Sequence, residues 1–444
     1  MPIFKRIAKC IVFMIIILFI NMMLIFILEP KESESKIMWQ GFYKEKNLNM
    51  LFIGSSVCQR FFNPYIIDDI LKTNSFNMGT PAQLLQQTYV GINEAVKKHE
   101  IKTVIIGIGH FTLTQKENLN AEIAFTKAKA AKRNKIEKIK ETINFIFSND
   151  HIKKSESINY FFPWIFNRVN INYKNVSNNI KNKINSDRNK DEEKIIYEIG
   201  KGFGVARTSH NYNKVGSEVS GLIYSRDIYL KNFEILKKIS KFCKENNVNL
   251  IIVNTPHPFY DILSYGDEYF FTMKKLKDFF GSLNISYYDF NLIKPNIFQS
   301  KEDYFYDFEH LNEKGSTEFS KSFAKFMKLK ANGEDMNEYF YTPEEYLASI
   351  KHISIVNFDT QNSKKGINIL AKAYTGSKVD VEYEILVYDD ILKKYKVIRK
   401  YDQNPSYFYL INENKKIKIR VNARQIGTDI PYEKYYEKEI VFRK

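Results

Sequence analysis

Hydrophobic and polar residues divide the chain into three stretches of different character. Residues 11–28 form an apolar run in which Asn21 is the one polar residue. Between residues 48 and 335, short apolar runs alternate with segments of helical periodicity, the order typical of an α/β domain. From residue 340 to 444 the helical periodicity gives way to several short strand-like runs, which predict a small β-sandwich as an accessory domain.

The alternating stretch predicts the strands and helices of a parallel sheet. Fully apolar runs such as residues 103–108 are typical of strands that are buried on both faces. The expected strands are 50–53, 75–78, 103–108, 249–254 and 285–290. The expected helices are 65–71, 81–99, 226–246, 270–283 and 312–329. The alternation is interrupted at about 115–225 by a Lys- and Asn-rich insertion that we expect to be mostly helical.

The apolar run predicts a membrane helix. Its roughly 18 residues just reach the length that a helix needs to cross a bilayer. Lys5, Arg6 and Lys9 precede the run, and the more positive flank of a membrane helix stays in the cytoplasm. We therefore expect a single-pass protein of the cell membrane, with a cytoplasmic N-terminus and with residues 31–444 outside the cytoplasm.

A cleaved signal peptide is the competing interpretation of this run. No small-x-small cleavage site follows Leu28, and the run is long for a signal peptide. We therefore adopt an uncleaved anchor over residues 1–30. Residues 31–47 are polar and charged, which predicts a short stalk between the anchor and the α/β domain.

Charge and cysteine content narrow the function classes. A formal net charge of +16 often indicates nucleic-acid binding, but an outward-facing domain meets anionic lipid headgroups and wall polymers instead. A polyanion- or membrane-binding module and a merely solvated lysine-rich surface both stay open. Cys10, Cys58 and Cys243 lack metal-ligand spacing, and a Cys58–Cys243 disulfide stays open. No metal cluster or cofactor motif is visible in the sequence.

A serine nucleophile is suggested by Gly54-Ser55-Ser56, which ends the first expected strand. Ser56 then lies at the carboxyl edge of the sheet, where open α/β sheets place their sites. It also precedes a helix, whose N-terminal dipole favours developing negative charge. Because a serine hydroxyl needs a base to remove its proton, this short motif is a weak signal by itself.

The base and its orienting carboxylate are suggested by Asp307-Phe308-Glu309-His310. Asp307 precedes His310 by three residues, a spacing that lets the carboxylate hold the imidazole in one tautomer. Taken alone, this motif also fits a solvated loop followed by a helix cap. Together with Ser56 it supplies a nucleophile, a base and an orienting acid in the chain order of one large hydrolase class.

These motifs resemble those of the SGNH (GDSL-like) hydrolase family over roughly residues 48–330. The Gly-Ser-Ser motif that ends in Ser56 resembles the first block of the family, Gly79 matches the glycine of the second block, and the motif of Asp307 and His310 resembles the last block. The resemblance implies a three-layer parallel sheet and a catalytic triad of Ser56, His310 and Asp307. It also implies an oxyanion hole built from the amides of Ser56 and Gly79.

The third family block departs from the pattern. The family usually has Gly-x-Asn-Asp after the third strand, where this chain has Gly-Ile-Gly-His at 107–110. The asparagine that completes the oxyanion hole is therefore absent, and losing one such donor typically costs ~10²–10³ in rate. His110 and His257 are candidate substrate contacts, and each also fits a packed structural histidine. Cys58, close to Ser56 in the sequence, is expected to be a buried thiol.

Within the family, the chain is similar to the membrane-anchored subgroup that includes the lipoteichoic acid D-alanylation protein DltD. The shared features are one N-terminal anchor, the Gly-Ser-Ser block, the weak third block and a lysine-rich outer domain. The resemblance implies a serine esterase or O-acyltransferase for acyl esters of a cell-surface glycan or teichoic-acid-like polymer. It also implies a membrane-bound O-acyltransferase as partner. The alternative is a catalytically weak or inactive scaffold that binds such an acyltransferase or an anionic wall polymer.

Overall fold

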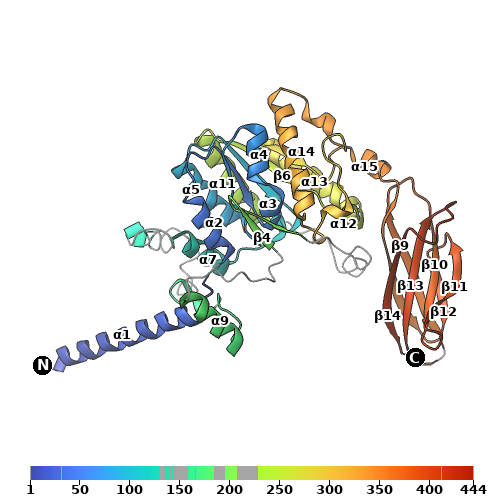
Figure 1. Cartoon of the computed structure of the whole chain (residues 1–444), viewed down its shortest axis with the longest axis horizontal. Helices are drawn as coiled ribbons and strands as arrows, with labels where there is room; N and C mark the ends of the chain where they lie inside the picture. Colours follow the sequence, from blue (N-terminus) through green and yellow to red (C-terminus); the bar gives the residue numbers. More distant parts are fainter. Residues whose placement is uncertain are drawn as a thin grey trace.

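A computed structural model gives a mixed α/β architecture with an apolar N-terminal helix, a parallel five-stranded sheet and C-terminal antiparallel sheets (Figure 1). The structure describes residues 2–31, 33–130, 136–137, 139–140, 143, 159–165, 167–184, 196–207, 229–411 and 413–443. Much of the insertion expected to be helical over about 115–225 therefore lies outside the described residues.

The parallel sheet positions the candidate site. Its strand order is β2-β1-β3-β6-β7, and all neighbouring strands are parallel. The strands are β1 (Met50–Gly54), β2 (Ser75–Asn77), β3 (Thr103–Ile108), β6 (Asn249–Asn254) and β7 (Ser286–Asp289). They are the five strands expected from the apolar runs, because each run was bounded by polar residues or glycine that end a buried strand.

Helices cover both faces of this sheet, because successive side chains of a strand point to opposite sides. Leu51 and Ile53 of β1 join one apolar cluster, whereas Phe52 joins the other. The first cluster includes residues of α5 (Leu85–Lys98), α11 (Leu230–Glu245) and α13 (Asp267–Ser282). The second cluster includes residues of α3 (Ser56–Phe61), α4 (Pro64–Leu71) and α14 (Glu313–Ala331).

Residues 31–47 differ from the polar stalk that we expected. Helix α2 (Glu34–Phe42) begins after Ser33, whose side chain caps its first turn. Trp39 and Phe42 of this helix are fully buried in the first apolar cluster. The helix is short and lies between the charged stretches 29–36 and 44–46, which hid its apolar face in the sequence. The chain therefore passes from the apolar N-terminal helix almost directly into the α/β core.

The end of the insertion forms a hairpin that the sequence pattern did not predict. It pairs β4 (Ile196–Gly200) with β5 (Phe203–Ala206), and its turn is formed by Lys201 and Gly202. The carbonyl of Lys201 accepts from the amide of Asn77 at 2.9 Å. Gly202 has φ +76°, and a Cβ there would lie 1.8 Å from the Asn77 carbonyl oxygen. Only glycine therefore allows this hairpin to approach the strand next to the candidate site.

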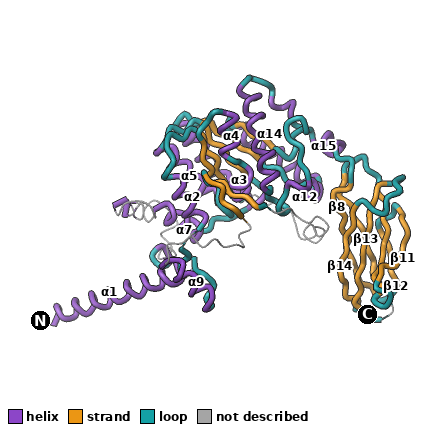
Figure 2. The backbone as a smooth tube through the Cα atoms, viewed as in Figure 1, coloured by secondary structure: helices purple, strands orange, loops and turns teal. Residues whose placement is uncertain are grey.

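The C-terminal residues form two antiparallel sheets that share one apolar core, to which Phe358 and Val421 contribute from opposite sheets. One sheet has the order β11 (Lys394–Asp402), β10 (Val381–Asp389), β13 (Lys415–Gln425), β14 (Lys434–Phe442). The other has the order β12 (Ser406–Leu410), β9 (Gly366–Thr375), β8 (Ile353–Ser363). These strands coincide with the strand-like runs of the sequence, and they are set apart from the parallel sheet (Figure 2).

The apolar run forms helix α1 (Pro2–Leu28). Within the described part of the chain, it is the one helix long and apolar enough to cross a membrane, and its most apolar stretch is only 6% buried. Its length and composition fit a membrane anchor and a signal sequence alike. The helix projects away from the rest of the molecule, with α9 (Tyr173–Ile184) beside its C-terminal end (Figure 1).

Candidate active site

The first strand brings Ser56 to the carboxyl edge of the sheet. β1 has β2 on one side and β3 on the other, so the strand order reverses there, and open α/β sheets bind ligands at such a switch point. Helix α3 begins at Ser56. Gly54 has φ +152°, and a Cβ there would lie 2.3 Å from the carbonyl oxygen of Gly107 in β3. The sharp turn before Ser56 therefore requires glycine.

Ser56, His310 and Asp307 form one hydrogen-bonded line. His310 Nε2 lies 2.7 Å from Ser56 Oγ, and His310 Nδ1 lies 3.0 and 2.9 Å from the two carboxylate oxygens of Asp307. An imidazole that donates from Nδ1 to Asp307 leaves Nε2 free to accept the serine proton. The side chains of His310 and Asp307 are 13% and 27% exposed, so the line is shielded from bulk water yet reachable by a substrate.

Asp307 is held as a carboxylate. Burial acts to raise its pKa, but the hydrogen bond and positive charge of His310 and the amides of Glu309 and His310 outweigh burial, so the pKa lies below its ordinary value. The two amides donate to Asp307 Oδ1 at 2.9 and 2.7 Å. The carboxylate therefore fixes both the loop and the imidazole, and it can balance the imidazolium that forms when serine loses its proton.

The loop that carries Asp307 and His310 is fixed at its ends. The amide of Tyr306 donates to the carbonyl of His310 at 2.8 Å. Asn312 caps α14, because its Oδ1 accepts from the amide of Gly315 at 3.0 Å, and its Nδ2 donates to the carbonyl of Asp303 at 2.8 Å. These bonds explain why two motifs about 250 residues apart in the sequence meet with hydrogen-bond geometry.

The oxyanion hole expected from Ser56 and Gly79 is only half formed. Within the described residues the Ser56 amide has no hydrogen-bond partner, because first-turn amides of a helix lack intrahelical acceptors. The Gly79 amide instead donates to Asn77 Oδ1 at 2.9 Å. Asn77 Nδ2 in turn donates to the carbonyls of Cys58 and Phe62 at 2.9 Å. Gly79 therefore supports the helix of the nucleophile, in contrast to the expected role of oxyanion donor.

A second histidine–carboxylate pair follows β6. His257 Nδ1 lies 2.6 Å from Asp261 Oδ2, both residues are buried, and the His257 amide donates to Asn291 Oδ1 at 2.7 Å. Burial acts to lower the pKa of His257, but Asp261, Glu309 and Asp289 together raise it above its ordinary value. Within the described residues no hydrogen bond joins this pair to the triad, so its expected contact with substrate stays a prediction.

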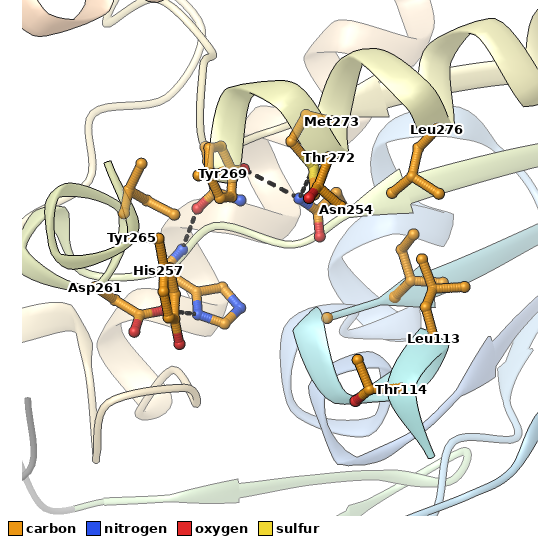
Figure 3. Close-up of a pocket in the computed structure, with 14 residues that line it drawn as sticks. Leu113, Thr114, Asn254, His257, Asp261, Tyr265, Tyr269, Thr272, Met273 and Leu276 are labelled. Carbon is orange, nitrogen blue, oxygen red and sulfur yellow. Dashed lines mark hydrogen bonds and ion pairs between the residues drawn. The ribbon is translucent and has the colours of Figure 1, made fainter. Parts of the chain in front are cut away.

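The His257 ring faces a small cavity on the side away from Asp261 (Figure 3). The cavity has a volume of about 20 Å³, and a space of this size holds about one water molecule. Leu113 and Met273 line it from the apolar side, and Gly109 lines it at the end of β3. The cavity therefore lies between the second pair and the strand next to β1.

Glu309 is a residue of this region that motif matching missed. A Cβ at Gly109 would lie 3.3 Å from Glu309 Oε1, with Val57 Cγ1 at 3.5 Å from the same point. Burial raises the pKa of Glu309, although the positive charges of His310 and His257 oppose this effect. The sequence showed a carboxyl side chain immediately before His310, but the motif did not show that this side chain points toward Gly109.

Three other residues of interest in the sequence are His110, Cys58 and Cys243. His110 begins helix α6 (His110–Thr114), and its side chain lies outside the described residues. Cys58 and Cys243 are both free and buried, so the disulfide left open by the sequence is not formed. Burial raises the pKa of the Cys58 thiol and raises that of Cys243 to about 12, so both thiols are poor nucleophiles.

Comparison with known proteins leaves the family open. No family model and no curated protein matches the chain. A protein provisionally named as a platelet activating factor from Streptococcus pneumonia shares 9% identity, with 66% of this chain and 91% of that chain covered and a TM-score of 0.31. A provisionally named acylhydrolase from Bacteroides fragilis shares 11% identity, with 68% and 99% covered and a TM-score of 0.30. Likenesses at this level carry no weight beside the geometry of the site.

Proposed function

We propose that this chain is a membrane-anchored, extracytoplasmic serine esterase or O-acyltransferase of the SGNH type. The hydrogen-bonded line from Asp307 through His310 to Ser56 carries the proposal. It places a hydroxyl, a base and an orienting acid at the carboxyl edge of a parallel sheet, the arrangement that activates a serine for attack on an acyl group.

The reaction steps follow from these positions. Ser56 Oγ attacks the carbonyl carbon of an acyl ester, and its proton passes to His310 Nε2. The Ser56 amide donates to the tetrahedral oxyanion, and Asp307 balances the imidazolium. Collapse expels the alcohol, which takes the proton from Nε2, and leaves an acyl-serine. Water or a sugar or polyol hydroxyl then gives its proton to His310 Nε2 and attacks the acyl carbon. Collapse of this second intermediate breaks the bond to Ser56 Oγ, which takes the proton back from Nε2, and releases an acid or a new ester.

The path from the anchor supports a substrate close to the membrane. α1 ends at Leu28, and α2 begins at Glu34, whose carboxylate accepts from Gln59 Nε2 at 3.1 Å. Six extended residues span at most about 20 Å, a helical turn about 5 Å, and two extended side chains with the hydrogen bond between them about 15 Å. These contacts therefore keep Ser56 within about 40 Å of the end of α1.

The finer assignments rest on the similarity to the membrane-anchored SGNH subgroup. We infer that the substrate is an acyl ester of a cell-surface glycan or teichoic-acid-like polymer, and that the partner is a membrane-bound O-acyltransferase. The net charge of +16 favours an anionic polymer because opposite charges steer association. A site near the bilayer is also within reach of an acyl group delivered through the membrane.

A catalytically weak scaffold is the second candidate, and the engaged amide of Gly79 favours it. A site with one backbone donor stabilises an oxyanion less than a site with two, by a factor of ~10²–10³ in rate. Such a protein would bind the acyltransferase or the polymer without turning over esters.

Ester turnover separates the two candidates. The full chain in lipid nanodiscs would be mixed with p-nitrophenyl acetate, with and without glycerol as acceptor. The enzyme proposal predicts steady release of p-nitrophenol, with acetylglycerol appearing if the acyl-serine prefers a hydroxyl to water. The scaffold predicts neither p-nitrophenol release above the protein-free rate nor an acyl adduct, and that pair of results would overturn the proposed activity.

A further inference from the structure

The outer end of α1 is held by a segment that lies about 140 residues later in the sequence. Trp164 Nε1 donates to Asn21 Oδ1 at 2.8 Å, and Asn21 Nδ2 donates to the carbonyl of Phe161 at 3.0 Å. Asn21 is the one polar residue of the apolar run. Because lipid offers no hydrogen bonds, a polar side chain in a membrane helix needs partners within the protein. This segment supplies a donor and an acceptor to the Asn21 amide group.

The same segment closes the C-terminal end of α1. The last carbonyls of a helix lack partners within the helix. Asn179 Nδ2 donates to the carbonyls of Ile27 and Glu29 at 2.8 and 3.1 Å. The amide of Val169 donates to the carbonyl of Leu28 at 2.9 Å. The Lys183 ammonium also donates to carbonyls of this last turn, where positive charge is favoured by the helix dipole.

The segment carries exposed apolar and aromatic side chains together with exposed lysines. Phe161, Ile165 and Ile171 are exposed, and Tyr173 is 91% exposed. Lys174 and Lys181 of α9 are also exposed. Exposed aromatic and aliphatic side chains beside basic ones are typical of surfaces that lie in the interface of an anionic bilayer.

The position of Asn21 sets the depth of the segment. Asn21 lies seven residues before the end of α1, which at 1.5 Å per residue is about 10 Å along the helix axis. The apolar run ends at Leu28 and just reaches the length of the hydrocarbon core, so Leu28 lies near the boundary between headgroups and acyl chains. The ring of Trp164, which donates to Asn21, therefore lies among the acyl chains of the outer leaflet, about 10 Å below that boundary at most.

We propose that residues 160–165 and 167–184 form a membrane clasp. The clasp grips the outer end of α1 and lies in the outer leaflet, with its exposed apolar side chains among the acyl chains and its lysines on anionic headgroups. The partner is the lipid bilayer itself. The clasp has a second consequence: its contacts with Asn21 and the last turn of α1 exist only if α1 is retained, so it also assigns α1 the role of an uncleaved anchor.

Tryptophan fluorescence tests the clasp directly, because the chain has two tryptophans and Trp39 is fully buried. The full-length Trp39→Phe variant, whose remaining tryptophan is Trp164, is reconstituted in vesicles with brominated acyl chains. We expect strong quenching by bromine on the acyl chains and weak quenching by aqueous acrylamide. The full-length Trp164→Phe variant, which reports Trp39, should be protected from both quenchers.

Two further results decide the details. In the Trp39→Phe background, Asn21→Leu keeps α1 apolar but removes both hydrogen bonds, so bromine quenching of Trp164 should fall at least two-fold. Vesicles containing phosphatidylglycerol should give stronger quenching than purely zwitterionic ones. If acrylamide quenches the fluorescence of Trp164 and bromine on the acyl chains does not, the clasp faces water or a protein partner and the proposal is wrong. Equal quenching in the two kinds of vesicle would show that the clasp does not bind anionic headgroups, and that part of the proposal would be wrong.

An independent observation concerns the missing oxyanion donor. The Glu309 carboxyl is partly buried and, within the described residues, makes no hydrogen bond. It lies at the point toward which a side chain at Gly109 would project, with Val57, the residue after the nucleophile, at the same point. Of the two amides expected to form the oxyanion hole, that of Ser56 has no hydrogen-bond partner among the described residues, whereas that of Gly79 donates to Asn77.

We also propose, on the basis of the proposed serine mechanism, that Glu309 in its neutral form donates a hydrogen bond to the oxyanion of the acyl group on Ser56. The ionisable groups around it are His310 and Asp307 on its own loop, His257 and Asp261 after β6, and Arg60 on α3. Burial raises the pKa of Glu309, which favours the neutral acid that such a bond requires.

Three full-length variants test this assignment against p-nitrophenyl acetate turnover. Glu309→Ala should lower kcat by ~10²–10³, and Glu309→Gln, which keeps a donor, should retain most of kcat. The double variant Gly109→Asn with Glu309→Ala should recover activity, because a side-chain amide at position 109 points to the same place. Loss in Glu309→Gln equal to that in Glu309→Ala would show instead that the carboxylate charge matters, and would overturn the donor role.

The pH profile gives a second readout that a structural role would not move. If neutral Glu309 is required, wild-type kcat falls as pH rises through the pKa of Glu309, and this fall is absent in Glu309→Gln. An alkaline limb shared by both proteins would contradict the assignment. A wild type without turnover would reject the proposed function itself, whereas wild-type turnover with unaffected Glu309 variants would reject only this donor.

Discussion

Replacing Ser56 by alanine is expected to lower the turnover of acyl esters by ~10⁴–10⁶-fold, since removal of the nucleophile leaves only binding and the oxyanion donors. The fold should persist, because Ser56 is partly exposed and, among the described residues, its hydroxyl bonds to His310 alone. The measurement is kcat for p-nitrophenyl acetate, together with the melting temperature of each protein.

Ser55→Ala is the matched control for this substitution. Ser55 is the residue before α3, and its side chain makes no capping hydrogen bond. Its removal should leave kcat within a few-fold of wild type. A Ser56→Ala variant as active as Ser55→Ala would mean that the serine line is structural and that ester turnover, if present, arises elsewhere.

The second large effect is expected from Asp307→Asn, with a fall in kcat of ~10⁴. The amide oxygen of asparagine can still accept from the backbone, but it cannot balance the imidazolium and it favours the wrong tautomer of His310. Since the pKa of Asp307 is below its ordinary value, the carboxylate stabilises the folded loop above the pKa of an unfolded aspartate, about 3.9. That contribution is lost only as pH falls through the lower, folded pKa.

Asp303→Asn serves as the control for a nearby charge, since Asp303 lies in the short 3-10 helix Glu302–Tyr304 just before this loop. Asp303 pairs with Lys314 on the surface, and surface ion pairs contribute little to stability. Its kcat should stay near that of wild type. An Asp307→Asn variant that keeps wild-type kcat, in a protein whose Ser56→Ala variant is inactive, would assign the orienting role to another group.

The strands were predictable because they carry the strongest local signal. The run at 103–108 is apolar throughout, and a strand buried on both faces needs no other information. Helix α2 was not predicted, because it is nine residues long and lies between the charged stretches 29–36 and 44–46. Only the tertiary contacts of Trp39 and Phe42 reveal that they belong to the core. The β4–β5 hairpin was missed for a related reason: its position depends on the contact of Gly202 with the carbonyl of Asn77.

In the candidate site too, features that depend on a short motif could be predicted, and features that depend on tertiary contacts could not. Ser56, Asp307 and His310 could be chosen from the sequence because each belongs to a short motif with a chemical reason for its spacing. The engagement of Gly79 could not, because it depends on the side chain of Asn77 two residues earlier turning back to the amide. Glu309 was part of the last motif, but its approach to Gly109 appears only when β3 and the last loop are placed together.

The most direct test of the serine mechanism is the site of modification by a fluorophosphonate probe on the full chain in nanodiscs. The probe reacts only with an activated serine, and digestion followed by mass spectrometry identifies the residue. The serine mechanism predicts a stoichiometric adduct on Ser56 that is lost in Ser56→Ala and in His310→Ala. An unmodified Ser56 in a folded wild-type protein that hydrolyses p-nitrophenyl acetate, or an adduct on another serine, would contradict it.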